Sequence, residues 1–383
     1  MTYKGFKTIS SLDVKGKKVL LRVDLNSEII NKKPIISQRI IEHAKTIKEL
    51  KKRQAKVIII AHQSRKGKKD FTSLREHSKL LNRLVKVKFV HDIIGKKAEK
   101  EITNLKKGEA ILLENIRFLK EEYKPTKDNK IINFFKDKIE IYINDAFSIC
   151  HRNETSIVSL PKIIKEKAIG RVLENELKQI EKIKVDDENT LFILGGNKVE
   201  DIILLINKKN ILSTGVLALL CLKSKGQKLG LEDKILREEE KFILEIKRNL
   251  KNIKVPKDMA ININGKREEI DIGKFPVKYE ALDIGKETIK FYEEEISKAD
   301  KIFWKGTAGD CSRKEFCLGT KRLLKAMENS KAFCIVAGGH SGTEVDRYKI
   351  NKDKLGYVSL SGGSLVHYIA KKRLPGLEAL KIR

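Results

Sequence analysis

Short apolar runs alternate along the chain with longer segments in which apolar residues recur at helical spacing among Lys and Glu. Strand followed by helix at this interval is typical of a parallel sheet covered by helices. We therefore predict an α/β protein with two doubly wound, Rossmann-like parallel sheets. The predicted strands lie near residues 17–23, 56–61, 86–91, 110–115 and 139–144 in the first half, and near 190–195, 209–214, 257–263, 301–305, 331–337 and 356–360 in the second.

The segment between the two halves, residues 163–186, has the pattern of a helix. Its apolar residues recur at helical spacing, and Gly170 is its only glycine. A chain of 383 residues is long for one domain. We therefore predict two domains, 1–162 and 187–364, joined by a hinge helix over 163–186.

Polar side chains follow several predicted strands of the first half. Arg, His, Asp or Asn stands at or just beyond the carboxyl end of the apolar runs in 19–26, 57–65, 111–118 and 140–152. In an open α/β sheet these ends line the ligand crevice. Arg and His side chains that converge there favour an anionic ligand, such as a phosphate or a carboxylate.

The second half places glycines after its strands instead. Glycine before a helix allows backbone N–H groups to approach an anion, although a single glycine also ends strands for geometric reasons alone. Several clusters in one half favour a nucleotide-phosphate site. With the cationic first half, this is the layout of a two-domain phosphotransferase. The clusters are Gly195-Gly196-Asn197-Lys198, Gly306, Gly338-Gly339-His340-Ser341 and Gly362-Gly363-Ser364.

These motifs resemble, in order and over nearly the whole chain, those of the phosphoglycerate kinase family. Asp70–Leu74 and His340, where many members have Asp, resemble the archaeal branch. The matching segments are Arg22–Asn26, Gln38–Ile40, His62 with Arg65, Leu113–Phe118, Asn144–Phe147 with His151-Arg152, Gly195–Val199, Trp304–Gly306, Gly338–Ser341, Ser361–Gly363 and Leu374–Gly376.

The resemblance implies a cytoplasmic enzyme of glycolysis and gluconeogenesis, a phosphotransferase with a carboxyl group as acceptor. It implies reversible phosphoryl transfer between 1,3-bisphosphoglycerate with ADP and 3-phosphoglycerate with ATP, with Mg²⁺. Residues 1–162 then bind phosphoglycerate, 187–364 bind the nucleotide, and 365–383 return to the first domain. We expect a monomer or a homodimer.

The resemblance also implies site residues, but it leaves the ligands of the metal undetermined. No general base is assigned, because phosphoryl transfer depends on positioning and charge stabilisation. The implied substrate-binding residues are Asp24, Leu25, Asn26, Arg39, His62, Gln63, Ser64, Arg65, Arg117 and Arg152. The nucleotide-binding residues are Gly195, Gly196, Lys198, Lys305, Gly306, Gly338, Gly339, His340 and Ser341, and the catalytic ones are Arg39, Lys198, Gly339 and Gly362.

Several positions on the nucleotide side depart from the family pattern. The family usually has a second Lys where this chain has Ile202, Asn where it has Lys305, and an acidic residue where it has Ser312. Further departures are Thr307, Ala337 and His340. Two hypotheses follow: an active phosphoglycerate kinase, or a divergent paralogue with an intact glycerate site and weakened or altered nucleotide use. We expect Lys305 to supply charge to a phosphate in place of the missing Lys.

Composition adds three expectations. The formal charge of +30 comes from Lys residues scattered along the whole chain among Glu, which indicates compositional drift and not a specific nucleic-acid site. No apolar run reaches the length of a membrane span, so we expect no membrane partner. The five cysteines are widely spaced without a CxxC pair, so we predict neither a disulfide framework nor a zinc site.

Overall fold

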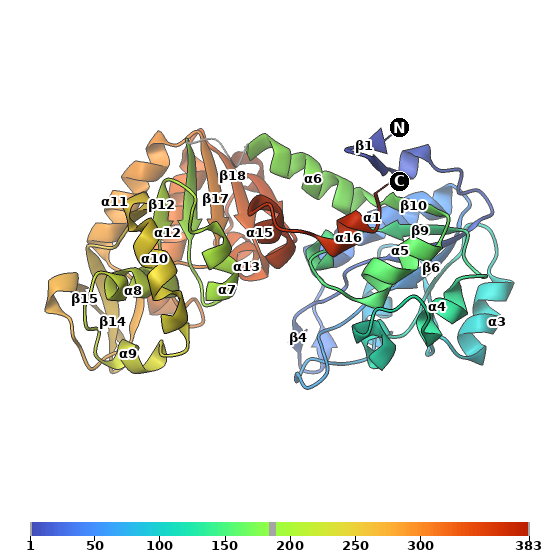
Figure 1. Cartoon of the computed structure of the whole chain (residues 1–383), viewed down its shortest axis with the longest axis horizontal. Helices are drawn as coiled ribbons and strands as arrows, with labels where there is room; N and C mark the ends of the chain where they lie inside the picture. The colour runs from blue at the N-terminus through green and yellow to red at the C-terminus, as the bar shows by residue number, and fades with distance from the viewer. Residues whose placement is uncertain (1, 184–188, 382–383) are drawn as a thin grey trace. The chain divides into compact units, whose positions relative to one another are not determined.

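The computed structural model describes residues 2–183 and 189–381. Two six-stranded sheets dominate the described residues, and within each sheet all neighbouring strands run parallel. Helices separate successive strands of each sheet (Figure 1). The predicted fold class, α/β with two doubly wound parallel sheets, is therefore confirmed.

The described chain gathers into two compact units, which we describe separately. Unit 1 comprises residues 1–177 and 373–383, and unit 2 comprises residues 178–372. The chain passes from unit 1 to unit 2 within helix α6 (Arg171–Ile183). The red helix α16 (Pro375–Glu378) lies among the blue and green elements of unit 1 (Figure 1).

The sheet of unit 1 has the order β10-β9-β3-β6-β8-β7. Its strands are β3 (Lys18–Arg22), β6 (Lys56–Ile60), β7 (Lys88–Phe89), β8 (Ala110–Leu112), β9 (Ile141–Asn144) and β10 (Glu166–Ile169). Its helices are α1 (Gln38–Lys52), α2 (Arg75–Asn82), α3 (Lys96–Asn104), α4 (Lys130–Phe135) and α5 (Leu160–Ile163). Two short antiparallel pairs, β1 (Thr2–Tyr3) with β2 (Phe6–Lys7) and β4 (Ile29–Ile30) with β5 (Lys33–Pro34), stand outside it.

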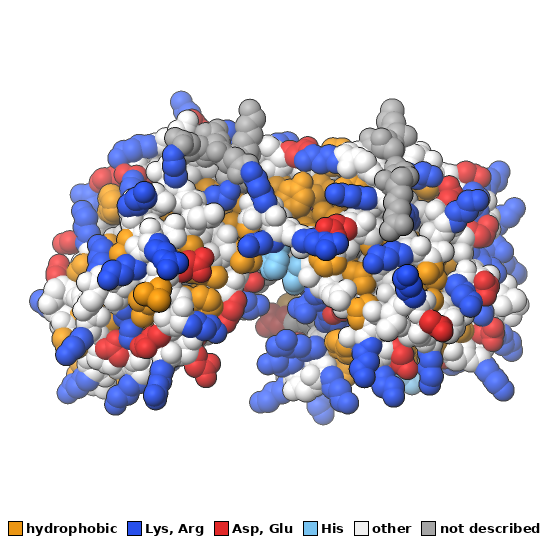
Figure 2. Space-filling model, in the orientation of Figure 1, with side chains coloured by type: hydrophobic (Ala, Val, Ile, Leu, Met, Phe, Trp, Pro, Cys, Tyr) orange, Lys and Arg blue, Asp and Glu red, His pale blue; other side chains and the backbone are white. Residues whose placement is uncertain are grey.

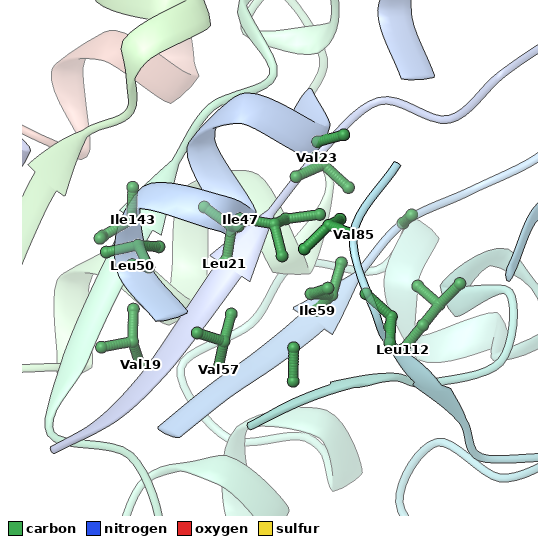
Figure 3. Close-up of a cluster of buried hydrophobic side chains, with 14 of the residues drawn as sticks. Val19, Leu21, Val23, Ile47, Leu50, Val57, Ile59, Val85, Leu112 and Ile143 are labelled. Carbon is green, nitrogen blue, oxygen red and sulfur yellow. The ribbon is translucent and has the colours of Figure 1, made fainter. Parts of the chain in front are cut away.

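The core of unit 1 explains why its strands are nearly all apolar. Val19, Leu21 and Val57 point from β3 and β6 toward α1. There they pack in one cluster with Ile47 and Leu50 of that helix (Figure 3). All five side chains are fully buried. A parallel sheet covered on both faces needs such continuous apolar runs, because neither face meets water.

The sheet of unit 2 has the order β13-β12-β11-β17-β18-β19. Its strands are β11 (Thr190–Leu194), β12 (Ile211–Ser213), β13 (Ile253–Lys254), β17 (Lys301–Lys305), β18 (Phe333–Ala337) and β19 (Gly356–Ser359). Its helices are α7 (Val199–Ile202), α8 (Gly215–Ser224), α9 (Leu231–Ile235), α10 (Ile243–Asn249), α11 (Lys286–Lys298), α12 (Leu318–Asn329), α13 (Gly339–Arg347), α14 (Lys352–Leu355) and α15 (Gly363–Ile369).

Two predicted elements differ in the structure. The predicted strand at 257–263 is β14 (Asp258–Ile263), which lies in a separate three-stranded antiparallel sheet with β15 (Lys266–Asp271) and β16 (Ala281–Ile284). Asn264 and Gly265 both have positive φ, as a tight hairpin turn requires. The helix predicted over 163–186 is wrong for its first residues, because 166–169 pair with β9 as strand β10; residues 184–188 lie outside the described ones.

The cysteine prediction is wrong for one pair. Cys311 and Cys317 form a disulfide, since a 3-10 turn over Lys314–Cys317 brings their Cα atoms to 4.4 Å, a separation that a disulfide spans. Cys150, Cys221 and Cys334 are free and buried.

Lys and Arg side chains are spread over the face in Figure 2 and alternate with acidic ones. Across the described ranges, no helix has both the length and the apolar character needed to cross a membrane.

Candidate active site

In unit 1, Asp24 and Arg39 form an ion pair just beyond the end of β3. Arg39, in the first turn of α1, places Nη1 3.3 Å from Asp24 Oδ2 and donates to the Asn26 carbonyl at 3.2 Å. Asp24 is buried, and it also accepts from Ser148 Oγ and, at 2.9 Å, from the Asn26 N–H. Burial alone would raise the pKa of Asp24, but Arg39 and these hydrogen bonds hold that pKa far below its ordinary value. Asp24 is therefore a fixed carboxylate.

His62 lies buried just beyond the end of β6. Its Nδ1 is 3.3 Å from Nη2 of Arg22, and because a guanidinium only donates, Nδ1 accepts. Burial, followed by the nearby Arg117, lowers the pKa of His62 well below its ordinary value. The ring is therefore neutral and carries its proton on Nε2, which makes it a hydrogen-bond donor without a charge.

Arg117 follows β8 and is also buried. Its Nη1 donates to the Ser64 carbonyl and its Nη2 to Glu154 Oε1, both at 2.7 Å. Arg117 Nε and Glu154 Oε2 are buried without a hydrogen-bond partner among the described residues. Two hydrogen bonds therefore hold the guanidinium of Arg117 in place, and its unpaired buried Nε costs free energy.

Arg65 and Arg152 are exposed, in contrast to Arg117. Neither side chain has a hydrogen-bond or ion-pair partner within the described ranges. Partial burial, followed by Arg117, lowers the pKa of Arg152, and Arg65 contributes to the same lowering. The guanidinium group of Arg152 therefore lies near those of Arg117 and Arg65. Such a group of cations is stabilised by a multiply charged anion.

The other predicted substrate-binding residues support this group from within the fold. Gln63 is fully buried, accepts from the Ser27 N–H at 2.9 Å and donates to the Ser27 carbonyl at 3.0 Å. Asn26 accepts from the Ser64 N–H at 2.8 Å, and Ser64 Oγ donates to Asp70 at 2.6 Å. The Leu25 side chain belongs to the core, so only its backbone can face a ligand.

Sequence reasoning assigned no role to Arg22, Glu122 or Glu154, which lie under the cationic group. Arg22 is fully buried at the end of β3 and donates through Nε to Ser156 Oγ at 3.0 Å. Glu122 accepts from Ser156, and burial together with Glu154 raises its pKa to about 7. Arg22 opens the motif that contains Asp24 and so had a sequence signal; Glu122 and Glu154, both distant in sequence from Arg22, had none.

In unit 2, Gly195, Gly196 and Gly306 allow the ends of two strands, β11 and β17, to meet. Gly195 and Gly196 donate their N–H groups to the carbonyls of Lys305 and Thr307, both at 2.8 Å. A Cβ on Gly306 would lie 1.9 Å from the carbonyl oxygen of Gly195. These three glycines are thus required by close backbone packing, whether or not an anion binds there.

Lys305 at the end of β17 is buried beside the other glycine turns. Its Nζ is 3.4 Å from Asp201 Oδ2, and a Cβ added to Gly338 or Gly362 would lie 3.5 or 3.4 Å from it. Burial lowers the pKa of Lys305; Asp201 offsets part of this effect and Lys198 adds to it. The buried ammonium of Lys305 thus pairs with one carboxylate and lies near a second lysine, an arrangement that favours an additional anion.

The remaining predicted nucleotide residues occupy helix starts. Lys198 is exposed immediately before α7, and Gly338, with φ of 99°, precedes α13. No described atom lies within 4 Å of a Cβ added to Gly339, so space is open in front of this turn. Ser341 is buried, and the side chain of His340 lies outside the described residues.

Two family departures have structural consequences. Ile202, in place of the usual second Lys, is fully buried, so its side chain takes no part in an exposed site. Ser312 bonds to Asp310 at 2.6 Å within the loop that the Cys311–Cys317 disulfide closes. Unit 2 therefore offers fewer charged side chains to a ligand than unit 1.

Comparisons with known proteins now extend these observations. The family model described as "Phosphoglycerate kinase" matches residues 9–372. Relatives named "Phosphoglycerate kinase" include one from Methanothermus fervidus, 36% identical over 98% of this chain and 97% of its own length, and one from Sulfurisphaera tokodaii, 37% identical over 97% and 95%. The solved phosphoglycerate kinase from Pyrococcus horikoshii has a TM-score of 0.90 at 30% identity, covering 97% of this chain and 98% of its own.

These matches extend across both units, as do the sequence motifs and the two parallel sheets. They confirm the resemblance inferred from the motifs, and phosphoglycerate kinases are phosphotransferases. The chain belongs to the phosphoglycerate kinase family.

Proposed function

We propose that the protein catalyses reversible phosphoryl transfer between 1,3-bisphosphoglycerate with ADP and 3-phosphoglycerate with ATP. The observation that carries this proposal is the cationic group of unit 1. Arg39, Arg65, Arg117 and Arg152 surround the strand ends together with His62, and an acceptor that bears both a carboxylate and a phosphate requires such cations.

In the proposed complex, the guanidinium groups bind the two anionic ends of 3-phosphoglycerate. Neutral His62 donates from Nε2, and the fixed carboxylate of Asp24 accepts from the substrate hydroxyl while it orients Arg39. Arg39 is exposed enough to reach the transferring phosphoryl group, since its side chain retains 20% of its accessible surface. Its charge then offsets the negative charge that accumulates in the transition state.

On the nucleotide side, we propose that Lys198 and Lys305 bind phosphate oxygens of ATP. Backbone N–H groups at the start of α13, including those of Gly339, His340 and Ser341, add partial positive charge. Gly362 precedes α15 and lies close enough to Gly338 to share the same phosphate. The buried Lys305 lies beside the glycine turns, although Ile202 replaces the second lysine usual in the family. This lysine favours an active kinase over a divergent paralogue.

The residues beside these turns do not fit a protein-bound Mg²⁺. Among the described residues, the carboxylate that contacts Lys305 beside the glycine turns is Asp201, and this ion pair already uses it. Mg²⁺ prefers several oxygen ligands and retains its waters. We therefore propose that Mg²⁺ enters as a complex with the nucleotide and needs no carboxylate of the protein. The proposed setting is cytoplasmic glycolysis and gluconeogenesis, in an enzyme of the archaeal branch.

A coupled assay tests this function directly. Purified protein with ATP, Mg²⁺ and 3-phosphoglycerate should form 1,3-bisphosphoglycerate, which an excess of a reducing dehydrogenase converts with oxidation of its cofactor. Calorimetry should separately detect 3-phosphoglycerate and ADP binding. Binding of 3-phosphoglycerate without turnover would favour the divergent paralogue, and binding of neither would contradict the proposal.

A further inference from the structure

His43 is a buried histidine of α1 that none of the proposed roles uses. It lies one turn after Arg39 on the same helix, and its side chain retains 2% of its accessible surface. Nε2 lies 3.2 Å from the backbone nitrogen of Asp24, and Nδ1 lies 2.8 Å from Oδ2 of Asp145. The ring thus joins the polypeptide at the end of β3 to the residue that follows β9.

These two contacts fix the tautomer of the ring. A backbone N–H only donates, so Nε2 of His43 must be the acceptor and carries no proton. Nδ1 then carries the proton and donates to the carboxylate of Asp145. A carboxylate behind a histidine orients the ring and strengthens the opposite nitrogen as an acceptor.

Asp145 is itself rigidly held. Its Oδ1 accepts from the Val172 N–H at 2.7 Å in the first turn of α6, and its own N–H donates to the Arg22 carbonyl at 2.9 Å. A Cβ on Gly170 would lie 2.2 Å from Oδ1, so the carboxylate has no room to move toward that residue. Both carboxylate oxygens are therefore used, and the histidine has a fixed support.

The backbone that His43 holds belongs to Asp24, and the side chain of Asp24 holds Arg39. A displacement of the Asp24 N–H would move its carboxylate and, with it, the guanidinium that we propose to approach the phosphoryl group. Leaving the N–H without an acceptor would also cost free energy, because the site is buried.

We propose that His43 is a positioning residue for the glycerate site, which sets the place of Asp24 and Arg39 through the Asp145–His43–Asp24 chain. The inference rests on the proposed function, since it assumes that these two residues bind 3-phosphoglycerate. If His43 only filled space in the core, replacing it with an apolar side chain of similar size would not selectively change the kinetic constants for one substrate.

Three variants separate the two hydrogen bonds. His43→Gln keeps an acceptor oxygen near the place of Nε2, whereas His43→Asn keeps a donor near the place of Nδ1, and His43→Leu keeps neither. With ATP saturating, we expect kcat/KM for 3-phosphoglycerate to fall on the order of tenfold or more in His43→Leu and His43→Asn. We expect His43→Gln to recover most of the loss, and KM for ATP to stay within about twofold throughout.

Thr46→Val provides a matched control on the same helix. Thr46 is fully buried, and its hydroxyl has no hydrogen-bond partner among the described residues, so its loss should leave both substrates' kinetic constants unchanged. Thermal unfolding and circular dichroism establish that each variant is folded. If His43→Leu cannot be purified folded, the comparison of Gln with Asn still decides, because each keeps one of the two bonds.

The outcomes are distinct. A folded His43→Leu with wild-type kinetics, equal losses in Gln and Asn, or equal losses for both substrates would overturn the inference and leave the proposed function in place. Absence of turnover and of 3-phosphoglycerate binding in the wild-type protein would overturn the proposed function and the inference with it.

Discussion

Units 1 and 2 contain the same kind of sheet but place different chemistry at its strand ends. Unit 1 uses charged side chains held by buried partners, such as Arg117 on Glu154 and Arg39 on Asp24. Unit 2 has glycine turns together with Lys198 and Lys305, and Lys305 is paired with Asp201. Under the proposed function, unit 1 recognises its multiply charged substrate through side chains, whereas unit 2 binds the nucleotide phosphates mainly through backbone N–H groups.

The comparison is tested most strongly by Arg39→Ala. We expect kcat to fall on the order of 10²-fold or more, because negative charge in the transition state loses its direct partner. Steady-state kinetics with both substrates measure the effect. Arg152→Ala is the contrasting variant, and it should mainly raise KM for 3-phosphoglycerate. Near-normal turnover of Arg39→Ala would contradict the role that we give it.

Glu122 allows the buried charges of unit 1 to be tested by pH. Its pKa rises from 4.5 to about 7 on folding, so its contribution to stability is present below about pH 4.5 and is lost as the pH rises to about 7. Relative to Glu122→Gln, the wild-type free energy of unfolding should therefore fall by on the order of 3 kcal/mol from pH 4.5 to pH 8. Urea unfolding at several pH values measures it; parallel pH profiles would show that the carboxyl group is not perturbed.

Lys305→Met tests whether unit 2 relies on a side-chain charge as well as on backbone. Methionine keeps most of the buried stem, so we expect ADP affinity to fall about tenfold, as for the loss of one charge-assisted hydrogen bond. Affinity for 3-phosphoglycerate should not change. Calorimetry measures both, and unchanged ADP binding would mean that Lys305 serves only Asp201. Lys301→Met, at the other end of the same strand, is a matched control.

The smallest expected effect concerns the drifted loop of unit 2. Ser312→Glu restores the acidic residue usual in the family, and we expect ADP to bind about threefold more tightly through a hydrogen bond to the ribose. Restoring the usual Lys at position 202 is less informative, because Ile202 is fully buried and a buried ammonium without a partner destabilises the fold. Weaker ADP binding by Ser312→Glu would indicate that the nucleotide lies elsewhere.

The sequence predicted those parts of the fold that depend on apolar runs. The strands at 18–22, 56–60 and 301–305 are predicted because each contains an uninterrupted apolar run, as a sheet with two covered faces requires. The strand predicted near 257–263 was grouped with the second parallel sheet, because its hairpin partner β15 is largely polar (Lys266–Asp271) and gives no strand signal. Strand β10 was assigned to a helix, since its few residues continue the helical spacing of α6.

The candidate site was predicted to the extent that its residues stand in motifs. His43 and Asp145 are 102 residues apart, and a histidine in mid-helix has no pattern that indicates its partner. Glu122 and Glu154 likewise act through contacts that exist only after folding. Long-range pairing of buried polar groups is therefore the part of the site that a single sequence does not contain.

The C-terminal segment gives unit 1 an unusual order of completion. Leu374, Leu377 and Leu380 are buried in it, and the Gly376 N–H donates to the Cys150 carbonyl at 2.9 Å. During translation, unit 2 is synthesised after residues 1–177 and before residues 373–383. Unit 1 is therefore started before unit 2 but completed after it. A nascent chain halted before residue 373 would present unit 2 intact while the apolar surface around Cys150 and Ile157 stays uncovered.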